Sequence, residues 1–276
     1  MNRHTSSIRD FLYEPPGPKA RRRIAVFTAI SVAALIALLA VVIRQFYVTG
    51  QLDGKYWSIF LRYTTWRFLA RGLAGTVKVA LTASVVTFCA GMLLMMGRIS
   101  RFKPLNWLCT VIIELSRGIP TLLFIYFFFL VAPQFGLALP AFWKITLPVS
   151  ISASGVVAEV LRSGVNAVPK GQREAAVALG MRERSVFFKI IFPQAFRYVI
   201  PALISELVIV LKDTTFAYVV NYADLMQNAK VLISNYNALL SVYLVAALIY
   251  IIINYLLNKL SVWAARRTSV TAAAAK

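Results

Sequence analysis

The feature that most constrains this chain is a series of apolar runs, each long enough to cross a bilayer. The first run, IAVFTAISVAALIALLAVVI at 24–43, contains no charged residue, and a helix needs about 20 apolar residues to span the hydrocarbon core. Five further apolar runs with few charges lie at 74–97, 106–131, 140–161, 197–220 and 238–258. The pattern predicts an all-α, polytopic membrane protein with six transmembrane helices.

Composition agrees with this prediction and argues against other classes. Hydrophobic residues make up 59% of the chain, more than a soluble domain carries. The net charge is +20, but the cations occur in short clusters between apolar runs, a pattern that does not indicate nucleic acid binding. The single histidine, His4, and the two cysteines, Cys89 and Cys109, have no metal-ligand spacing, so we expect neither a metal site nor a disulfide framework.

The basic clusters also predict the orientation of the chain. They flank the runs at Arg21–Arg23, Arg98–Lys103, Arg162–Arg197 and Lys259–Arg267, and such clusters favour the cytoplasmic side. Both termini are then cytoplasmic, with a disordered tail at 1–20 and a second tail at 261–276. The segment 21–45 is expected to be an added N-terminal transmembrane helix rather than a cleaved signal peptide, because its apolar run is long and more spans follow.

The segment 46–72 is the exception, because it is extracytoplasmic in this topology yet contains Arg62, Arg67 and Arg71. Its aromatic residues, such as Trp57 and Trp66, suit a membrane interface. We interpret the segment as partly an interfacial amphipathic helix. The remaining transmembrane domain extends over 73–260 and includes a cytoplasmic loop at 164–193.

That loop contains the charged stretch REAAVALGMRERSVFFKIIFP at 173–193. Good helix formers at 172–179 precede Gly180, which suits a helix end. Ala175, Ala176 and Leu179 share one face of this helix, small enough for a close approach to a partner's groove. A second helical stretch with an apolar face is expected at 183–192, ending at Pro193. The simpler alternative is a basic loop without a partner.

The same stretch resembles the cytoplasmic signature of ABC importer permeases, in which EAA, Gly, Ile, Leu and Pro follow at fixed spacing. Glu174, Ala175, Ala176 and Gly180 fit, as do Ile190 and Pro193, while Phe192 stands where Leu is usual. Further stretches, GLAGTVKVAL at 72–81, SRGIPTLLFIYFF at 116–128 and LKDTTFAYVV at 211–220, are similar to the polar amino acid importers. The proline-containing tail and the added first helix look like the glutamate-uptake permeases of actinobacteria.

This resemblance implies a type I ABC importer permease core of five helices plus an added N-terminal helix, in a bacterial cell membrane. It implies that Glu174, Ala175, Ala176 and Gly180 belong to a coupling helix that contacts two ATP-binding subunits. A second permease subunit, an extracytoplasmic substrate-binding protein and a glutamate or related substrate are the other implied partners. The chain has no G-x-x-x-x-G-K-[ST] motif, so no cofactor is expected here and Mg-ATP belongs to the partner subunits.

Charges within the spans are costly and mark functional candidates. Arg117 lies near mid-span and suits a carboxylate, and Glu206 lies at similar depth and suits an ammonium group. Lys212, Asp213 and Thr214 match the family's KDT stretch and are candidates for an outer vestibule. Structural pairing is the alternative for several of these charges, because Glu114 with Arg117 and Glu159 with Arg162 are each three residues apart.

Other functions remain as alternatives. An ion-coupled secondary transporter would often show two similar halves, and no internal repeat is visible. A membrane enzyme would need a nucleophile or metal cluster, for which the sequence offers no candidate, so we expect a transport subunit rather than an enzyme. A structural membrane subunit would leave the EAA stretch without a purpose. Within the ABC class, glutamine, arginine and histidine are alternative substrates.

Overall fold

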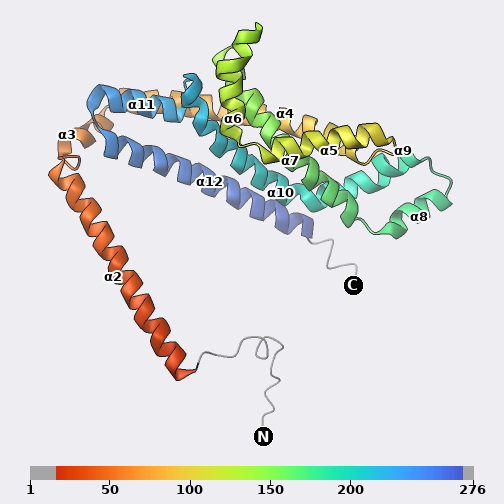
Figure 1. Ribbon diagram of the computed structural model, residues 1–276, viewed down its shortest axis with the longest axis horizontal. Helices are drawn as coiled ribbons and strands as arrows, with labels where there is room; N and C mark the ends of the chain where they lie inside the picture. The colour runs from red at the N-terminus through yellow and green to blue at the C-terminus, as the bar shows by residue number, and fades with distance from the viewer. Residues whose placement is uncertain (1–16, 270–276) are drawn as a thin grey trace. The chain divides into compact units, whose positions relative to one another are not determined.

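The computed structural model describes residues 17–269, with side chains through residue 263, and this part of the chain is helical without any strand (Figure 1). The chain divides into two compact units, Met1–Gly54 and Lys55–Lys276. Five helices are long and apolar enough to cross a membrane, and a bent helix pair makes a sixth span if it is counted as one. This count agrees with the six predicted spans. The predicted tails at 1–20 and 261–276 lie partly outside the described residues, at 1–16 and 270–276, while 18–20 belong to α2 and 261–269 to α12.

The first unit contains one long helix, α2 (Pro18–Val48). Proline is favourable in a first helical turn because that turn needs no backbone N–H donor, and the helix therefore starts ahead of the predicted run at 24. None of its residues is buried within the chain. The helix is apolar around its whole circumference, as expected for a helix surrounded by lipid.

The second unit holds the other elements in chain order. Before the cytoplasmic loop these are α3 (Gly54–Trp57), η1 (Ser58–Leu61), α4 (Tyr63–Arg98), α5 (Lys103–Gly118), α6 (Thr121–Tyr126), η2 (Phe127–Val131), η3 (Ala132–Phe135) and α7 (Ala141–Ala167). After it come α8 (Lys170–Ala178), α9 (Glu183–Val186), η4 (Phe187–Ile191), α10 (Phe192–Asp213), η5 (Thr214–Val220), α11 (Leu225–Tyr236) and α12 (Leu239–Ser269). Figure 1 shows α8 and α9 at one end of this unit and α11 at the other.

Helix α7 is the centre of the second unit, because it contacts α4, α5, α6 and α10. Two glycines allow the closest approaches. A Cβ atom on Gly155 would collide with Ser116 of α5, and one on Gly164 would collide with Val199 of α10. Small residues at such crossings let membrane helices gain van der Waals contact and interhelical hydrogen bonds. Ser150 of α7 accordingly donates to the Ala83 carbonyl of α4 at 3.2 Å.

The third predicted span is broken in the structure. Helix α5 ends at Gly118, and α6 begins at Thr121 with a change of direction of 98°. Pro120 lies at the break, where it provides no backbone donor and disfavours continuation of the preceding helix. Pro148 and Pro201, by contrast, lie inside continuous helices. Of these three prolines, only Pro120 lies at an interruption between helices.

One other sequence expectation differs from the structure. The helical stretch from 183 does not stop at Pro193, because α9, η4, α10 and η5 form one continuous run from Glu183 to Val220. Pro193 falls in the first turn of α10, directly after the wide π turn of η4, and local π geometry accommodates a proline in a membrane helix. The segment 46–72, expected to be partly an interfacial helix, contains the short helices α3 and η1, and α4 begins within it at Tyr63.

Candidate functional site

The EAA stretch forms helix α8, which ends where the sequence predicted. Gly180 has φ of 74°, a left-handed conformation that glycine adopts without steric cost. Its N–H donates to the Val177 carbonyl at 2.9 Å, and the N–H of Met181 donates to the Ala176 carbonyl at 3.2 Å. These two bonds satisfy carbonyls that the last helical turn would otherwise leave unpaired. Gly180 therefore fixes the end of the helix.

Helix α8 has one buried residue, Ala176, and the residues beside it are exposed. Ala176 is 5% exposed and lies in an apolar cluster with Val186 and Ile191. Glu174, Ala175 and Gly180 are exposed, and Leu179 is 82% exposed. The predicted apolar face is thus divided, with Ala176 turned inward and Ala175 and Leu179 outward. An exposed apolar residue beside a carboxylate on a short helix suits a partner surface.

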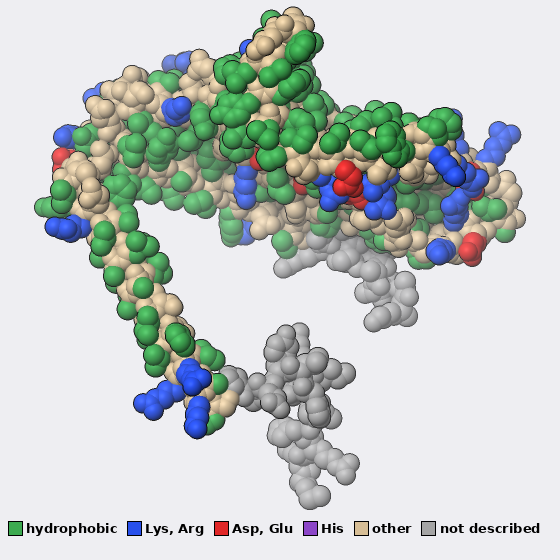
Figure 2. Space-filling view, viewed as in Figure 1, with side chains coloured by type: hydrophobic (Ala, Val, Ile, Leu, Met, Phe, Trp, Pro, Cys, Tyr) green, Lys and Arg blue, Asp and Glu red, His purple; other side chains and the backbone are tan. Residues whose placement is uncertain are grey.

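A carboxylate outside the EAA stretch connects α8 to two other segments. Glu183 of α9 accepts from the Arg173 guanidinium of α8 at 2.9 and 2.8 Å. It also accepts from Arg101, in the connection between α4 and α5, at 3.1 Å. Figure 2 shows Lys and Arg side chains gathered at this end of the second unit. The three charges join α8 to α9 and to the connection between α4 and α5.

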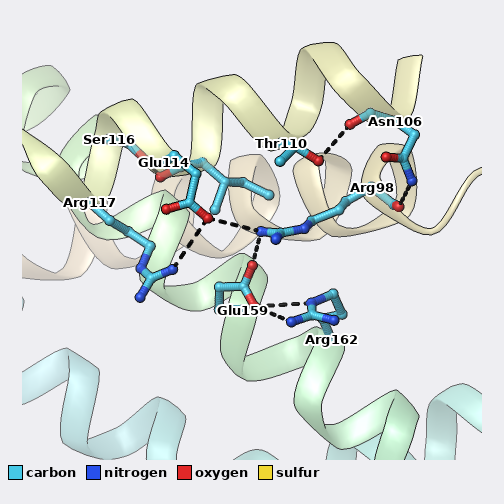
Figure 3. A network of polar contacts seen from close by, with 9 residues as sticks. Arg98, Asn106, Thr110, Glu114, Ser116, Arg117, Glu159 and Arg162 are labelled. Atoms are coloured by element: carbon cyan, nitrogen blue, oxygen red, sulfur yellow. Dashed lines mark hydrogen bonds and ion pairs between the residues drawn. The ribbon is translucent and has the colours of Figure 1, made fainter. Parts of the chain in front are cut away.

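A second charged network lies within the bundle (Figure 3). Arg98 of α4 contacts Glu159 of α7 and lies 3.7 Å from Glu114 of α5. The two predicted intrahelical pairs are present, Glu114 with Arg117 at 3.8 Å and Glu159 with Arg162 at 2.8 Å. Asn106 donates to the Arg98 carbonyl. The side chains of Arg98 and Glu159 are only 19% and 20% exposed, and such charges in a membrane domain require partners.

The broken span is held by a polar contact with α10. Thr121, the first residue of α6, donates to Asp213 at 2.9 Å and lies 2.9 Å from the hydroxyl of Ser152 on α7. Thr214 is buried and donates to the Leu211 carbonyl at 2.7 Å. Lys212 is exposed. Within the described residues Asp213 thus pairs with Thr121 rather than Lys212, so the KDT stretch holds the start of α6.

Glu206 lines a cavity of about 230 Å³ between α4, α7 and α10. The carboxylate side chain is 7% exposed, and it has no hydrogen bond or ion pair to any described residue. Ser84 and Thr87 are the other polar lining residues, and the rest of the wall is apolar, including Phe88, Val157 and Phe196. An unpaired carboxylate within a span is a functional candidate, because no side chain in the described part of the chain compensates its burial.

The two residues proposed for a zwitterion do not share this cavity. Arg117 is on the last turn of α5, is 44% exposed at its side chain, and is not among the described residues that line the Glu206 cavity. The structure therefore does not bring a cation and Glu206 together in this cavity. The expected pairing of Arg117 with Glu114 is instead what the geometry shows.

Sequence reasoning missed three contacts that shape these sites. Arg98 was considered only as a topology marker, although it joins three helices. Glu183 and Thr121 lie within quoted stretches, but their partners Arg101 and Asp213 are 82 and 92 residues away in the chain, so spacing did not reveal these contacts. Helix α11 was also missed, although Asp224 followed by Gln227 is the spacing of a capping pair. The Asp224 carboxylate accepts from the Gln227 N–H at 2.7 Å and caps that helix.

Comparison with known proteins gives the context for this geometry. Residues 88–270 match the family described as "Binding-protein-dependent transport system inner membrane component". The glutamate transport system permease protein GluD of Corynebacterium glutamicum is 37% identical over 77% of this chain and 79% of the relative. The arginine transport system permease protein ArtQ of Bacillus subtilis is 31% identical over 69% of this chain and 88% of the relative.

A solved structure agrees with both relatives. The crystal structure of an amino acid ABC transporter with histidines aligns with a TM-score of 0.70 at 31% identity, covering 75% of this chain and 96% of that chain. The matched family region, residues 88–270, includes α7, α8 and α10. The chain belongs to the binding-protein-dependent inner membrane components, as a polar amino acid ABC transporter permease that is not itself catalytic.

Proposed function

We propose that this chain lines the translocation pathway of an ATP-driven glutamate importer, together with a second permease subunit. Two ATP-binding subunits, which hold Mg-ATP, would contact α8, and an extracytoplasmic binding protein would deliver the substrate. Both termini would be cytoplasmic in a bacterial cell membrane. The glutamate permease GluD, 37% identical to this chain, supports the choice of substrate, and the basic clusters beside the spans support the orientation.

The exposure of α8 around its one buried residue, Ala176, supports the coupling role. Ala176 holds the helix to the apolar cluster, while Glu174, Ala175 and the end at Gly180 face outward. Because the helix has one buried residue, most of its surface is free to contact an ATPase subunit. Ion pairs from Arg173 through Glu183 to Arg101 would then carry a displacement of α8 to the α4–α5 connection.

Glu174→Arg tests this role directly. Uptake of radiolabelled glutamate is measured in cells that contain wild type, Glu174→Arg or the conservative variant Glu174→Asp at equal membrane abundance. We expect the charge reversal to abolish most uptake and to weaken co-purification of the ATPase subunits, while Glu174→Asp keeps most of both. Normal uptake and co-purification in Glu174→Arg would show that α8 is not the coupling element.

The Glu206 cavity favours a second candidate within the same class, the import of a cationic amino acid such as arginine. The lining has one carboxylate and no cation, so it suits an ammonium or guanidinium group better than a second carboxylate. The arginine permease ArtQ is 31% identical to this chain. Competition of labelled glutamate uptake by unlabelled glutamine, arginine and histidine distinguishes the substrates. Stronger competition by arginine than by unlabelled glutamate would replace the glutamate proposal and keep the transporter class.

A further inference from the structure

A second cavity, of about 750 Å³, lies at the end of the second unit that carries α8. Four segments line it: the end of α4 with its following connection, the end of α7, the start of α8, and α9 with η4. It is separate from the Glu206 cavity, with which it shares no lining residue. Neither the translocation pathway nor the outward surface of α8 accounts for it.

The cavity lining is strongly basic on one side. Its cations are Arg101, Lys170, Arg173 and Arg184, and its one carboxylate is Glu183. Four cations against one carboxylate leave a formal charge of +3. Glu183 already binds Arg101 and Arg173. Lys170 and Arg184 have no ion pair with any residue in the described part of the chain. Two cations are therefore free to bind an anion.

Apart from Ser100 and Asn166, most of the remaining lining is apolar. Met96 and Ile99 come from the end of α4, Val165 from the end of α7, and Phe187, Phe188 and Ile191 from η4. Phe188 is 37% exposed, and the nearby chain at the start of α5 exposes Phe102 and Trp107 at 65% and 68%. A soluble anion would contact only the cations and leave this apolar wall in water. A ligand that has both an anionic group and an alkyl chain would cover both parts.

The cavity also lies at the ends of two candidate membrane spans. The α4 and α7 spans end at Arg98 and Ala167, next to the lining residues, so the cavity lies at the level where lipid headgroups meet water. Basic pockets between transmembrane helices on the cytoplasmic side bind anionic headgroups, and each Lys or Arg near such a surface contributes about 1 kcal/mol. We propose that this cavity binds the headgroup phosphate of an anionic phospholipid, with Lys170 and Arg184 as its principal contacts.

The leaflet assignment rests on the proposed orientation, whereas the binding itself does not depend on transport. Because Lys170 and Arg173 belong to α8, a lipid bound here would contact the coupling helix from the membrane side. It would leave Glu174 and Leu179 free, since neither lines the cavity. Helix α8 would thus contact an anionic phospholipid in addition to its protein partners.

The test measures lipid retention by the full chain, purified in detergent with added phosphatidylglycerol or phosphatidylcholine of the same acyl chains. Native mass spectrometry reports the number of lipids retained. We expect wild type to retain phosphatidylglycerol in preference to phosphatidylcholine. The double variant Lys170→Gln with Arg184→Gln should bind phosphatidylglycerol about thirtyfold more weakly, from the loss of two cationic contacts. The control Lys189→Gln removes an exposed cation of η4 that does not line the cavity.

Three outcomes would overturn the proposal. The first is equal retention of the two lipids by wild type, or equal loss of phosphatidylglycerol in the double variant and the Lys189→Gln control. The second is displacement of phosphatidylglycerol by inorganic phosphate at a concentration comparable to that of the lipid, which would identify a soluble anion as the ligand. The third is loss of the lipid when the chain assembles with its ATPase and permease partners, because the cavity would then be a protein interface.

Discussion

The Arg173 guanidinium on α8 donates to both carboxylate oxygens of Glu183 on α9, at 2.9 and 2.8 Å. Arg173 directly precedes the EAA residues, and Glu183 begins the continuous helix that includes the Glu206 span. The pair therefore connects the proposed ATPase contact to a membrane helix across a turn that otherwise depends on Gly180. It provides a route by which movement of α8 can reach α10.

Charge exchange tests this connection. Glu183→Arg places a third cation beside Arg101 and Arg173, and we expect it to reduce uptake by about two- to fivefold, as is typical for loss of exposed ion pairs. The double variant Arg173→Glu with Glu183→Arg restores opposite charges and should recover part of the uptake. Uptake is measured at equal membrane abundance. No recovery in the double variant would mean that the pair does not connect α8 to α10.

The left-handed residue at the end of α8 predicts a second effect. Gly180→Ala forces a residue with a Cβ into φ of 74°, at a cost of about 1–2 kcal/mol. We expect faster amide hydrogen exchange in the last turn of α8 and reduced uptake. The matched control is Gly171→Ala in the same helix, where the new methyl group meets no atom and helix propensity improves. Equal exchange in the two variants would contradict a role for the Gly180 conformation.

Close contact between α5 and α7 predicts a stability difference between two alanine variants. Gly155→Ala places a methyl group against Ser116 and the Ile113 carbonyl, and overpacking of this kind costs about 1–3 kcal/mol. The control Gly118→Ala lies at the helix break, where nothing is near the added atom. Thermal unfolding of the two purified variants in detergent gives the comparison. A Gly155→Ala variant as stable as Gly118→Ala would show that this contact relaxes without cost.

The cap of α11 predicts a pH dependence of stability. Burial raises the pKa of Asp224 to about 6 from 3.8, since Asp224 is fully buried and the Gln227 N–H only partly compensates. The folded state thus holds a proton there between about pH 4 and 6 that the unfolded state has lost. The contribution of protonated Asp224 to the free energy of unfolding is full below about pH 4 and is lost as the pH rises through 6.

The substitution Asp224→Asn removes this titration and keeps a side-chain oxygen that can cap α11. We expect Asp224→Asn to flatten the fall in unfolding temperature between pH 4 and 7, and to raise stability at pH 7 by up to about 3 kcal/mol, which corresponds to a shift of about two pKa units. Unfolding of wild type and variant across this pH range provides the measurement. Parallel pH curves for the two proteins would assign the dependence to other groups.

Local sequence alone determines several structural features of this protein. Apolar runs of membrane length specify spanning helices because the bilayer offers no partner for free backbone groups. Gly180 ends α8 where expected because the left-handed turn favours glycine. The intrahelical pairs Glu114–Arg117 and Glu159–Arg162 follow from helical spacing. Each of these features depends on residues within a few positions of one another.

Only the tertiary structure decided which distant groups meet. It joined Arg98 to Glu159 and Thr121 to Asp213, although these partners are 61 and 92 residues apart. It separated Arg117 from the Glu206 cavity and gathered Lys170 and Arg184 around another. Helix periodicity gives the face of a residue but not the helix that covers that face. Close contacts at glycines such as Gly155 and the bend at Pro120 select the neighbouring helix.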